Sequence, residues 1–389
     1  MEFQVSKALI EYLFFTLWLT GLLGPRRIPV DNITQKIEEA AAAFQSHKIL
    51  FAQNLEQAQR NENNRVSGVS GSSRSYASVR SDDSQKSYNS QAHFQTRRLL
   101  GRGSYGDVYE VLEPSLNQVV ARKVFYLDDR SATDPMELEG QVMKEYEIMV
   151  QLTHDHIVRV MFPLKEESSF SIFMLPVADE DLRTYLESCV KSNYPTDSTD
   201  IILSWFGCLA DALAFAHRKG IVHRDIKPSN ILIKGSQVYL ADFGLAKDFA
   251  NHNASATNAD IVRGTPIYRA PEVRVDNPRG PPADVFSLGC VFSEMLTVCC
   301  NKSLDSYQGY RKATDDEFQF AFRANLRKVN EWLYDLGKSQ EDDVYHFLIN
   351  LVRSMLKQKH EERPLMEKVF GQMRKKDHPE ELFCSTHSF

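Results

Sequence analysis

The stretch that decides the fold is residues 221–233, which reads I-V-H-R-D-I-K-P-S-N-I-L-I. Two short apolar segments within residues 231–240 flank a polar turn, and this pattern predicts a β-hairpin. Asp225 and Asn230 precede the hairpin, and the triplet D-F-G that starts at Asp242 follows it. The hairpin is therefore expected to carry three side chains suited to metal binding or proton transfer at one end of a rigid support.

A glycine-rich stretch begins at Leu100 and reads L-G-R-G-S-Y-G-D-V, with the spacing G-x-G-x-x-G. Glycines let a backbone approach phosphate oxygens and offer them its N–H groups. The spacing alone is a weak signal, because dinucleotide-binding folds and ordinary turns share it. Here a strand pattern starting at Val108 follows the loop, where a dinucleotide-binding fold requires a helix. The loop also lacks G-K-[ST], which excludes a P-loop.

A lysine lies inside the next predicted strand, residues 119–125. The two-residue period of a strand puts Ala121, Lys123 and Phe125 on one face, so that the lysine points inward. An inward ammonium group requires an anion. The helix predicted next along the chain carries Glu145 in its apolar stripe, and we expect an ion pair between Lys123 and Glu145.

These motifs, in this order, resemble the signature set of the eukaryotic protein kinase domain over about residues 94–370. The triplet A-P-E at residues 270–272 completes the set. Lys227 and the pair Gly264-Thr265 resemble the serine/threonine branch of the family rather than the tyrosine branch. The resemblance implies an α+β fold with two lobes, a small β-rich lobe followed by a larger helical lobe, and an ATP-dependent phosphotransferase activity.

The resemblance also implies roles for individual residues. Asp225 is expected to accept the proton of the attacking hydroxyl, and Lys227 to neutralise charge on the transferred phosphoryl group. Asn230 and Asp242 are expected to hold Mg²⁺, and Lys123 the phosphates of ATP. Further ATP contacts are expected from Leu100, Gly101, Arg102, Gly103, Ser104, Gly106, Val108, Ala121, Glu145, Asp181 and Leu232, with Leu175 at the back of the adenine pocket.

Regulation is indicated by Arg224, which stands beside Asp225. This pair resembles kinases in which a phosphate bound to that arginine orders the activation segment. Ser255 and Thr257 are the candidate phosphorylation sites, and an activating kinase is the partner that they imply. An unmodified polar loop is the open alternative.

The composition sets wider limits. With 389 residues, of which 42% are apolar, the chain is long enough for two or three domain-sized units. Lys plus Arg total 46 and Asp plus Glu total 52, so the net charge is −6 and no nucleic-acid partner is expected. Six cysteines without a C-x-x-C pair indicate packed thiols and a cytoplasmic location. His154 and His156 have ligand-like spacing but lie where the kinase family has H-x-N-I-V, and we interpret both as structural.

The N-terminal region lies outside the kinase resemblance. Residues 1–60 are expected to be helical. Within them, residues 8–23 predict either a membrane-contacting helix or a helix buried against protein, and residues 33–60 an amphipathic helix. Residues 61–92 contain ten serines and no Leu, Ile, Phe, Trp or Met, which predicts a disordered linker.

Residues 93–375 are thus expected to form the kinase domain and residues 376–389 a C-terminal tail. Two classes of function compete for this domain. One is an active serine/threonine kinase that uses ATP and Mg²⁺ on protein substrates, and the other is a pseudokinase that serves as a scaffold or binding module. A pseudokinase normally lacks one of three residues that are all present here, Lys123, Asp225 and Asp242, so the enzyme is favoured.

Overall fold

The computed structural model describes residues 94–103, 106–113, 118–127, 135–166, 168–243, 266–273, 280–313, 319–385 and 387. The predicted helical extension and linker, residues 1–92, lie outside this part of the chain, and so do Ser104, Ser255 and Thr257. The side chain of Glu145 also lies outside it, although its backbone belongs to a described helix.

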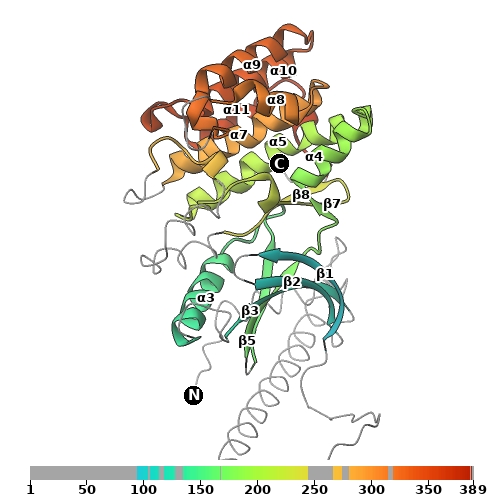
Figure 1. Cartoon of the computed structure of the whole chain (residues 1–389), viewed down its shortest axis with the longest axis vertical. Coiled ribbons are helices and arrows are strands. Elements are labelled where there is room, and N and C mark those ends of the chain that lie inside the picture. Colours follow the sequence, from blue (N-terminus) through green and yellow to red (C-terminus); the bar gives the residue numbers. More distant parts are fainter. Residues whose placement is uncertain are drawn as a thin grey trace, which may run out of the picture. The chain divides into compact units, whose positions relative to one another are not determined.

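Five strands form an antiparallel sheet: β1 (Gln95–Gly103), β2 (Gly106–Glu113), β3 (Gln118–Tyr126), β4 (Arg159–Lys165) and β5 (Ser169–Leu175). Their order across the sheet is β1-β2-β3-β5-β4. Helix α3 (Pro135–Met149) packs on one side of the sheet (Figure 1). The buried residues of α3, among them Leu138 and Val142, recur at helical spacing and cover the apolar face of the sheet.

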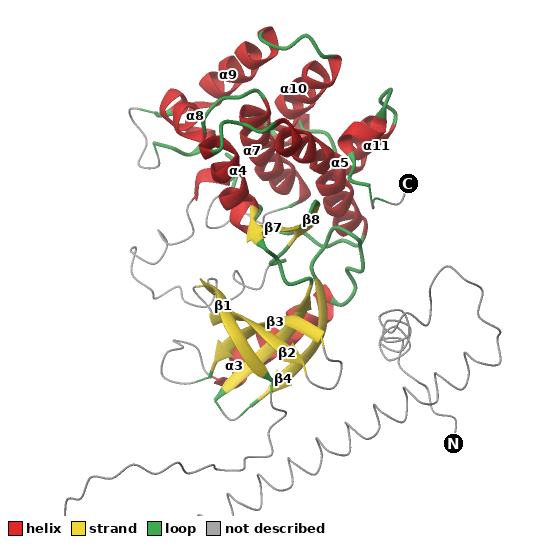
Figure 2. Ribbon diagram, turned by 90° about the vertical axis from the view of Figure 1, so that its right-hand side faces the viewer, coloured by secondary structure: helices red, strands yellow, loops and turns green. Residues whose placement is uncertain are grey.

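The larger lobe is mostly helical (Figure 2). Helices α5 and α7 form its centre, and nearly every residue along the middle of α7 is buried. Both helices are long and apolar enough to span a membrane, but most of each is buried inside the protein, as is usual for core helices. The helices are α4 (Leu182–Lys191), α5 (Thr196–Arg218), α7 (Pro281–Cys299), α8 (Leu304–Arg311), α9 (Leu326–Lys338), α10 (Asp343–Met355) and α11 (Met366–Arg374).

A second, three-stranded sheet lies between the large sheet and the helices (Figure 2). It consists of β6 (Glu180–Asp181), β7 (Ile231–Lys234) and β8 (Gln237–Leu240), and β7 pairs with both neighbours. The hairpin predicted in residues 231–240 is thereby confirmed. The two-lobed α+β architecture expected from the sequence is confirmed as well.

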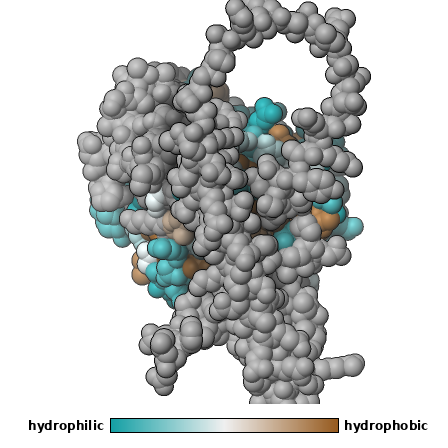
Figure 3. Space-filling view, turned by 90° about the horizontal axis from the view of Figure 1, so that it is seen from below, coloured by the Kyte–Doolittle hydropathy of each residue, from teal (hydrophilic) through white to brown (hydrophobic). Residues whose placement is uncertain are grey.

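Short 3₁₀ turns connect the larger elements. They are η1 (Pro228–Asn230), η2 (Pro266–Tyr268), η3 (Phe322–Asn325), η4 (His360–Glu362) and η5 (Pro379–Leu382). From below, the visible described residues form interspersed hydrophilic and hydrophobic patches (Figure 3).

The C-terminal segment, expected to be a tail, packs onto α5. Leu382, Phe383 and Cys384 are all buried. They cross the helix at Gly207, where an added Cβ would lie 2.6 Å from the carbonyl oxygen of Leu382 and closer still to the ring of Phe383. Glycine is therefore required at Gly207 for the close approach of two segments that are far apart in the sequence.

We expect Gly207→Ala to lower the free energy of unfolding by about 1–3 kcal/mol, because the new methyl group must displace backbone and a packed ring. Gly371→Ala is the matched control, since an added Cβ on α11 meets nothing within 4 Å and alanine favours a helix. Thermal unfolding of both variants tests this. Equal melting temperatures would contradict the described packing of the C-terminal segment.

Candidate active site

The glycine-rich loop closes the hairpin of β1 and β2. Gly103 pairs with Gly106 and Gly101 with Val108 across this hairpin. Gly106 has φ +151°, and an added Cβ would overlap the carbonyl oxygen of Val124. No other residue fits this turn without moving β3, so the loop keeps a bare backbone where phosphate binding was predicted. Arg102 is exposed beside it.

Lys123 joins the two lobes. Its Nζ atom, on β3, lies 2.7 Å from Oδ1 of Asp242, which follows β8. Burial alone would raise the pKa of Asp242, but the charge and hydrogen bond of Lys123 hold that pKa below its ordinary value. The inward orientation predicted for Lys123 is confirmed, and its described partner is Asp242. The predicted pair with Glu145 stays a prediction, because that side chain is outside the described residues.

The loop before β7 brings the predicted catalytic residues together. Lys227 Nζ lies 3.0 Å from Oδ2 of Asp225. Asn230 donates from Nδ2 to the backbone oxygen of Asp225 at 2.8 Å and to its Oδ2 atom at 3.2 Å. The turn η1 imposes this contact by folding the chain back between Lys227 and β7. The three side chains therefore form one connected group.

His223 ties this loop to the segment that leads to Asp242. Its Nδ1 atom accepts from the backbone N–H of Asp225 at 3.2 Å, and its Nε2 atom lies 2.8 Å from the carbonyl oxygen of Ala241. The first contact requires a lone pair on Nδ1, so the proton resides on Nε2 and is donated to Ala241. His223 is fully buried. Through these two ring contacts, the buried His223 sets the distance between Asp225 and Asp242.

Asp284 anchors the same loop to α7, and its role was not predicted from the sequence. Its carboxylate accepts from the backbone N–H of His223 at 2.7 Å and of Arg224 at 2.8 Å, and it lies 3.1 Å from Nε2 of His217. These bonds hold Arg224 at φ +69°, a left-handed conformation that costs about 1 kcal/mol or more and needs such support. The sequence feature that could have indicated this role is an aspartate within the mostly apolar run of residues 283–298.

The apolar residues predicted to contact adenine come from both sheets. Leu100, Val108 and Leu232 are partly buried against the core, and Ala121 is buried. Directly opposite Ala121 on the neighbouring strand is Met174, which is also buried, whereas Leu175 is opposite Arg159 on β4. The structure therefore puts Met174, rather than Leu175, beside Ala121 on the neighbouring strand.

Asp181 and Arg363 have clear structural contacts. Asp181 caps α4, because its side chain accepts from the backbone N–H of Thr184 at 2.8 Å. Arg363 makes two parallel bonds to Glu272, at 2.7 and 2.8 Å. This ion pair fastens the A-P-E triplet to the helical lobe.

The comparison with known families agrees with this geometry. The protein kinase domain family matches residues 94–373, and the chain belongs to that family. Its motifs belong to the serine/threonine branch.

Curated relatives of the chain include two kinases. The chain is 34% identical over 214 residues to mitogen-activated protein kinase kinase kinase A of Dictyostelium discoideum, and 36% identical over 215 residues to mitogen-activated protein kinase kinase kinase 1 of Arabidopsis thaliana. The matched regions cover 54% and 52% of this chain. They cover only 22% and 32% of the relatives' own lengths.

We expect Asp284→Asn to destabilise the protein by about 2–3 kcal/mol at pH 7, since a buried carboxylate that accepts two backbone N–H bonds is replaced by a neutral amide. Burial raises the pKa of Asp284, but its partners, His217 above all, hold it below the ordinary value. Its contribution to stability is therefore present above about pH 4 and is lost as the pH falls through the folded pKa.

Melting temperatures measured from about pH 6 down to about pH 2 test this, because the loss occurs below the ordinary pKa of an aspartate. The wild type is expected to lose stability more steeply on acidification than Asp284→Asn does. The exposed Asp335 provides the control Asp335→Asn, which is expected to follow the wild type. Parallel curves for the wild type and Asp284→Asn would contradict the anchoring role.

Proposed function

We propose that the chain transfers the γ-phosphoryl group of ATP to serine or threonine hydroxyls of proteins. The observation that carries this proposal is the convergence of Asp225, Lys227, Asn230 and Asp242, with Lys123 reaching Asp242 from the other lobe. Phosphoryl transfer needs placed charges rather than covalent chemistry, because its loose transition state spreads negative charge over three oxygens. The group supplies cations and carboxylates in one place.

The residues present fit ATP and Mg²⁺. Asn230 uses its amide nitrogen on Asp225, so its carbonyl oxygen is the atom that suits a hard cation. Asp242 supplies a carboxylate, and its lowered pKa keeps this group ionised at neutral pH. The turn at Gly106, which a Cβ would fill, offers backbone to phosphate groups. When bound, Mg²⁺ neutralises charge that develops on the phosphate oxygens.

Asp225 is the proposed base. It is held through its backbone by His223 and through its side chain by Asn230, so its carboxylate keeps one orientation. That carboxylate orients the substrate hydroxyl and accepts its proton as the new P–O bond forms, while the bond from the γ-phosphorus to the bridging oxygen breaks and ADP leaves. Lys227, which lies beside it, stabilises the negative charge on the phosphoryl group in transit.

Protein substrates are proposed from the similarity to the two relatives. Both are named as kinases that act on another kinase. Identities of 34% and 36% across the matched regions support a protein hydroxyl as the acceptor in this chain too. The rival proposal is a pseudokinase scaffold, which would bind nucleotide without transferring phosphate.

We expect Asp225→Asn to lower kcat by about 10²–10⁴-fold and to leave ATP affinity nearly unchanged, because the amide cannot accept the proton but keeps the shape of the side chain. Transfer of labelled phosphate and binding of a fluorescent ATP analogue, both measured with the full chain, separate these effects. Asp335→Asn is the control. Equal transfer by the wild type and Asp225→Asn would contradict the assignment of the base.

Activation by phosphorylation is a further part of the proposal. The exposed Arg224 is held in place by Asp284, which makes it a suitable partner for a phosphate on Ser255 or Thr257. We expect phosphatase treatment to lower the activity of the wild type. The double variant Ser255→Ala/Thr257→Ala is expected to have low activity that phosphatase does not change. A double variant as active as the untreated wild type would contradict this mode of activation.

A further inference from the structure

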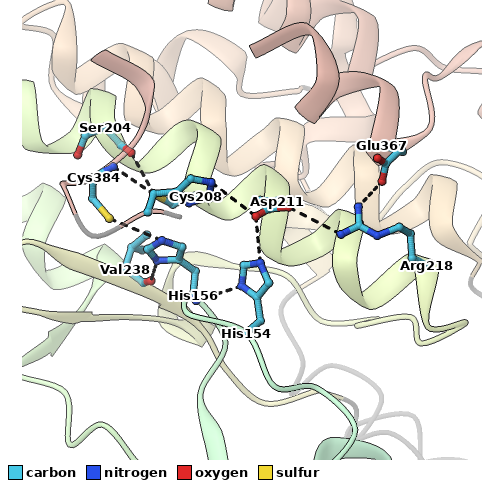
Figure 4. Close-up of polar contacts among 10 residues, drawn as sticks. His154, His156, Ser204, Cys208, Asp211, Arg218, Val238, Glu367 and Cys384 are labelled. Carbon is cyan, nitrogen blue, oxygen red and sulfur yellow. Dashed lines mark hydrogen bonds and ion pairs between the residues drawn. The ribbon is translucent and has the colours of Figure 1, made fainter. Parts of the chain in front are cut away.

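Three buried side chains lie close together beside α5. They have no role in the proposed phosphoryl transfer. They are His156, which precedes β4, Cys208 on α5, and Cys384 of the C-terminal segment (Figure 4). One ligand atom from each lies within 4.8 Å of the other two. Two sulfur atoms and an imidazole nitrogen at this spacing match the donor set that Zn²⁺ takes in structural sites.

The histidine is oriented as a metal ligand. Its Nδ1 atom lies 2.9 Å from the backbone oxygen of Val238, and its Nε2 atom lies 3.6 Å from Sγ of Cys384. The carbonyl oxygen can only accept, so Nδ1 carries the proton and Nε2 presents a lone pair to the two sulfurs. Histidine ligands in proteins usually have this second hydrogen bond, which fixes both tautomer and ring orientation.

The two cysteines are joined by a backbone contact as well. The N–H of Cys384 donates to Sγ of Cys208 at 3.3 Å, and Figure 4 shows both side chains and His156 around one point. An N–H bond to sulfur stabilises a thiolate, the form that binds metal. The four other cysteines, Cys189, Cys290, Cys299 and Cys300, are buried apart from any such group within the described residues.

His387, three residues after Cys384, lies beside this group and is the candidate for a fourth ligand. The ring of His387 stacks on that of His156, with centroids 5.4 Å apart. Its Nε2 atom lies 3.6 Å from Oδ2 of Asp211. Since Nε2 is directed to this carboxylate, Nδ1 is the ring nitrogen that would bind the metal. A carboxylate behind a histidine is a common second contact in zinc sites. A surface cavity lined by His154, Asp211 and His387 offers an entry path beside it.

We propose that His156, Cys208, Cys384 and His387 bind one structural Zn²⁺ ion that fastens the C-terminal segment to both α5 and the loop before β4. That loop pairs with β8, since the N–H of Val158 donates to the carbonyl oxygen of Leu240 at 2.9 Å. Leu240 lies two residues before Asp242. The ion therefore supports the strand that leads to the candidate active site, and it takes no part in the reaction.

Metal analysis of the purified full chain tests the site directly. Wild-type protein, dialysed after expression with zinc in the medium, is expected to contain about one zinc per chain by mass spectrometry. Cys208→Ser and Cys384→Ser are each expected to lose at least nine tenths of it. Cys300→Ser, another buried cysteine, is the control and keeps the wild-type content. Wild-type protein without zinc, or undiminished zinc in both variants, would overturn the proposal.

A second measurement uses the wild-type chain and therefore tests the site even if these variants fail to fold. Wild-type chain stripped of metal and loaded with Co²⁺ is expected to show the d–d absorption of a tetrahedral site and the charge-transfer bands of two thiolates. Removal of zinc is expected to lower the melting temperature by roughly 5 °C or more.

Octahedral Co²⁺ absorption, or a disulfide between Cys208 and Cys384 in protein purified under reducing conditions, would overturn the site. A Co²⁺ spectrum unchanged in His387→Ala would overturn the assignment of the fourth ligand.

Discussion

The hydrogen bonds of one buried carboxylate, that of Asp284, determine the shape of the loop on which the candidate active site depends. With only 2% of its surface exposed, this group needs strong partners, and it finds them in the backbone N–H groups of His223 and Arg224. The loop that contains His223 and Arg224 is therefore held in one conformation beside the N-terminal end of α7. His223 then transmits the constraint, because its ring bonds both Asp225 and the backbone just before Asp242.

The contact between Lys123 and Asp242 depends on that arrangement. A lysine from the β-rich lobe can reach the carboxylate only when β8 presents Asp242 at the lobe boundary, and Asp242 has φ +60° there. A left-handed conformation in a residue other than glycine is held by its surroundings, and such positions concentrate at functional sites. Two such residues, Arg224 and Asp242, flank the hairpin of β7 and β8. Part of the backbone strain of the described residues therefore lies beside the charged groups of the candidate active site.

Much of the fold and the site was predictable from local sequence patterns. The hairpin, the inward direction of Lys123 and the grouping of Asp225 with Asn230 follow from strand periodicity and short spacing. The residue matches to a kinase domain supplied the order of the lobes. These features depend on residues that are close together in the sequence, or on motifs that are recognisable from their own residues.

The remainder depended on contacts between distant segments. The bond of Asp284 to His223 spans 61 positions, and that of Lys123 to Asp242 spans 119. Met174 faces Ala121 because of the register between β3 and β5, which the sequence does not specify to a single residue. His156 and Cys384 are 228 positions apart, and nothing in the sequence links the histidine to the cysteine. Only the packing of the C-terminal segment on α5 brings them together.

The candidate active site around Asp225 and Asp242 is proposed to transfer phosphate to serine or threonine. The most direct measurement is phosphoamino-acid analysis of a generic protein substrate after incubation with the full chain, γ-labelled ATP and Mg²⁺. We expect label on phosphoserine or phosphothreonine that depends on Mg²⁺. ATP binding without labelled product, after treatment with an activating kinase, or label found only on phosphotyrosine, would contradict it.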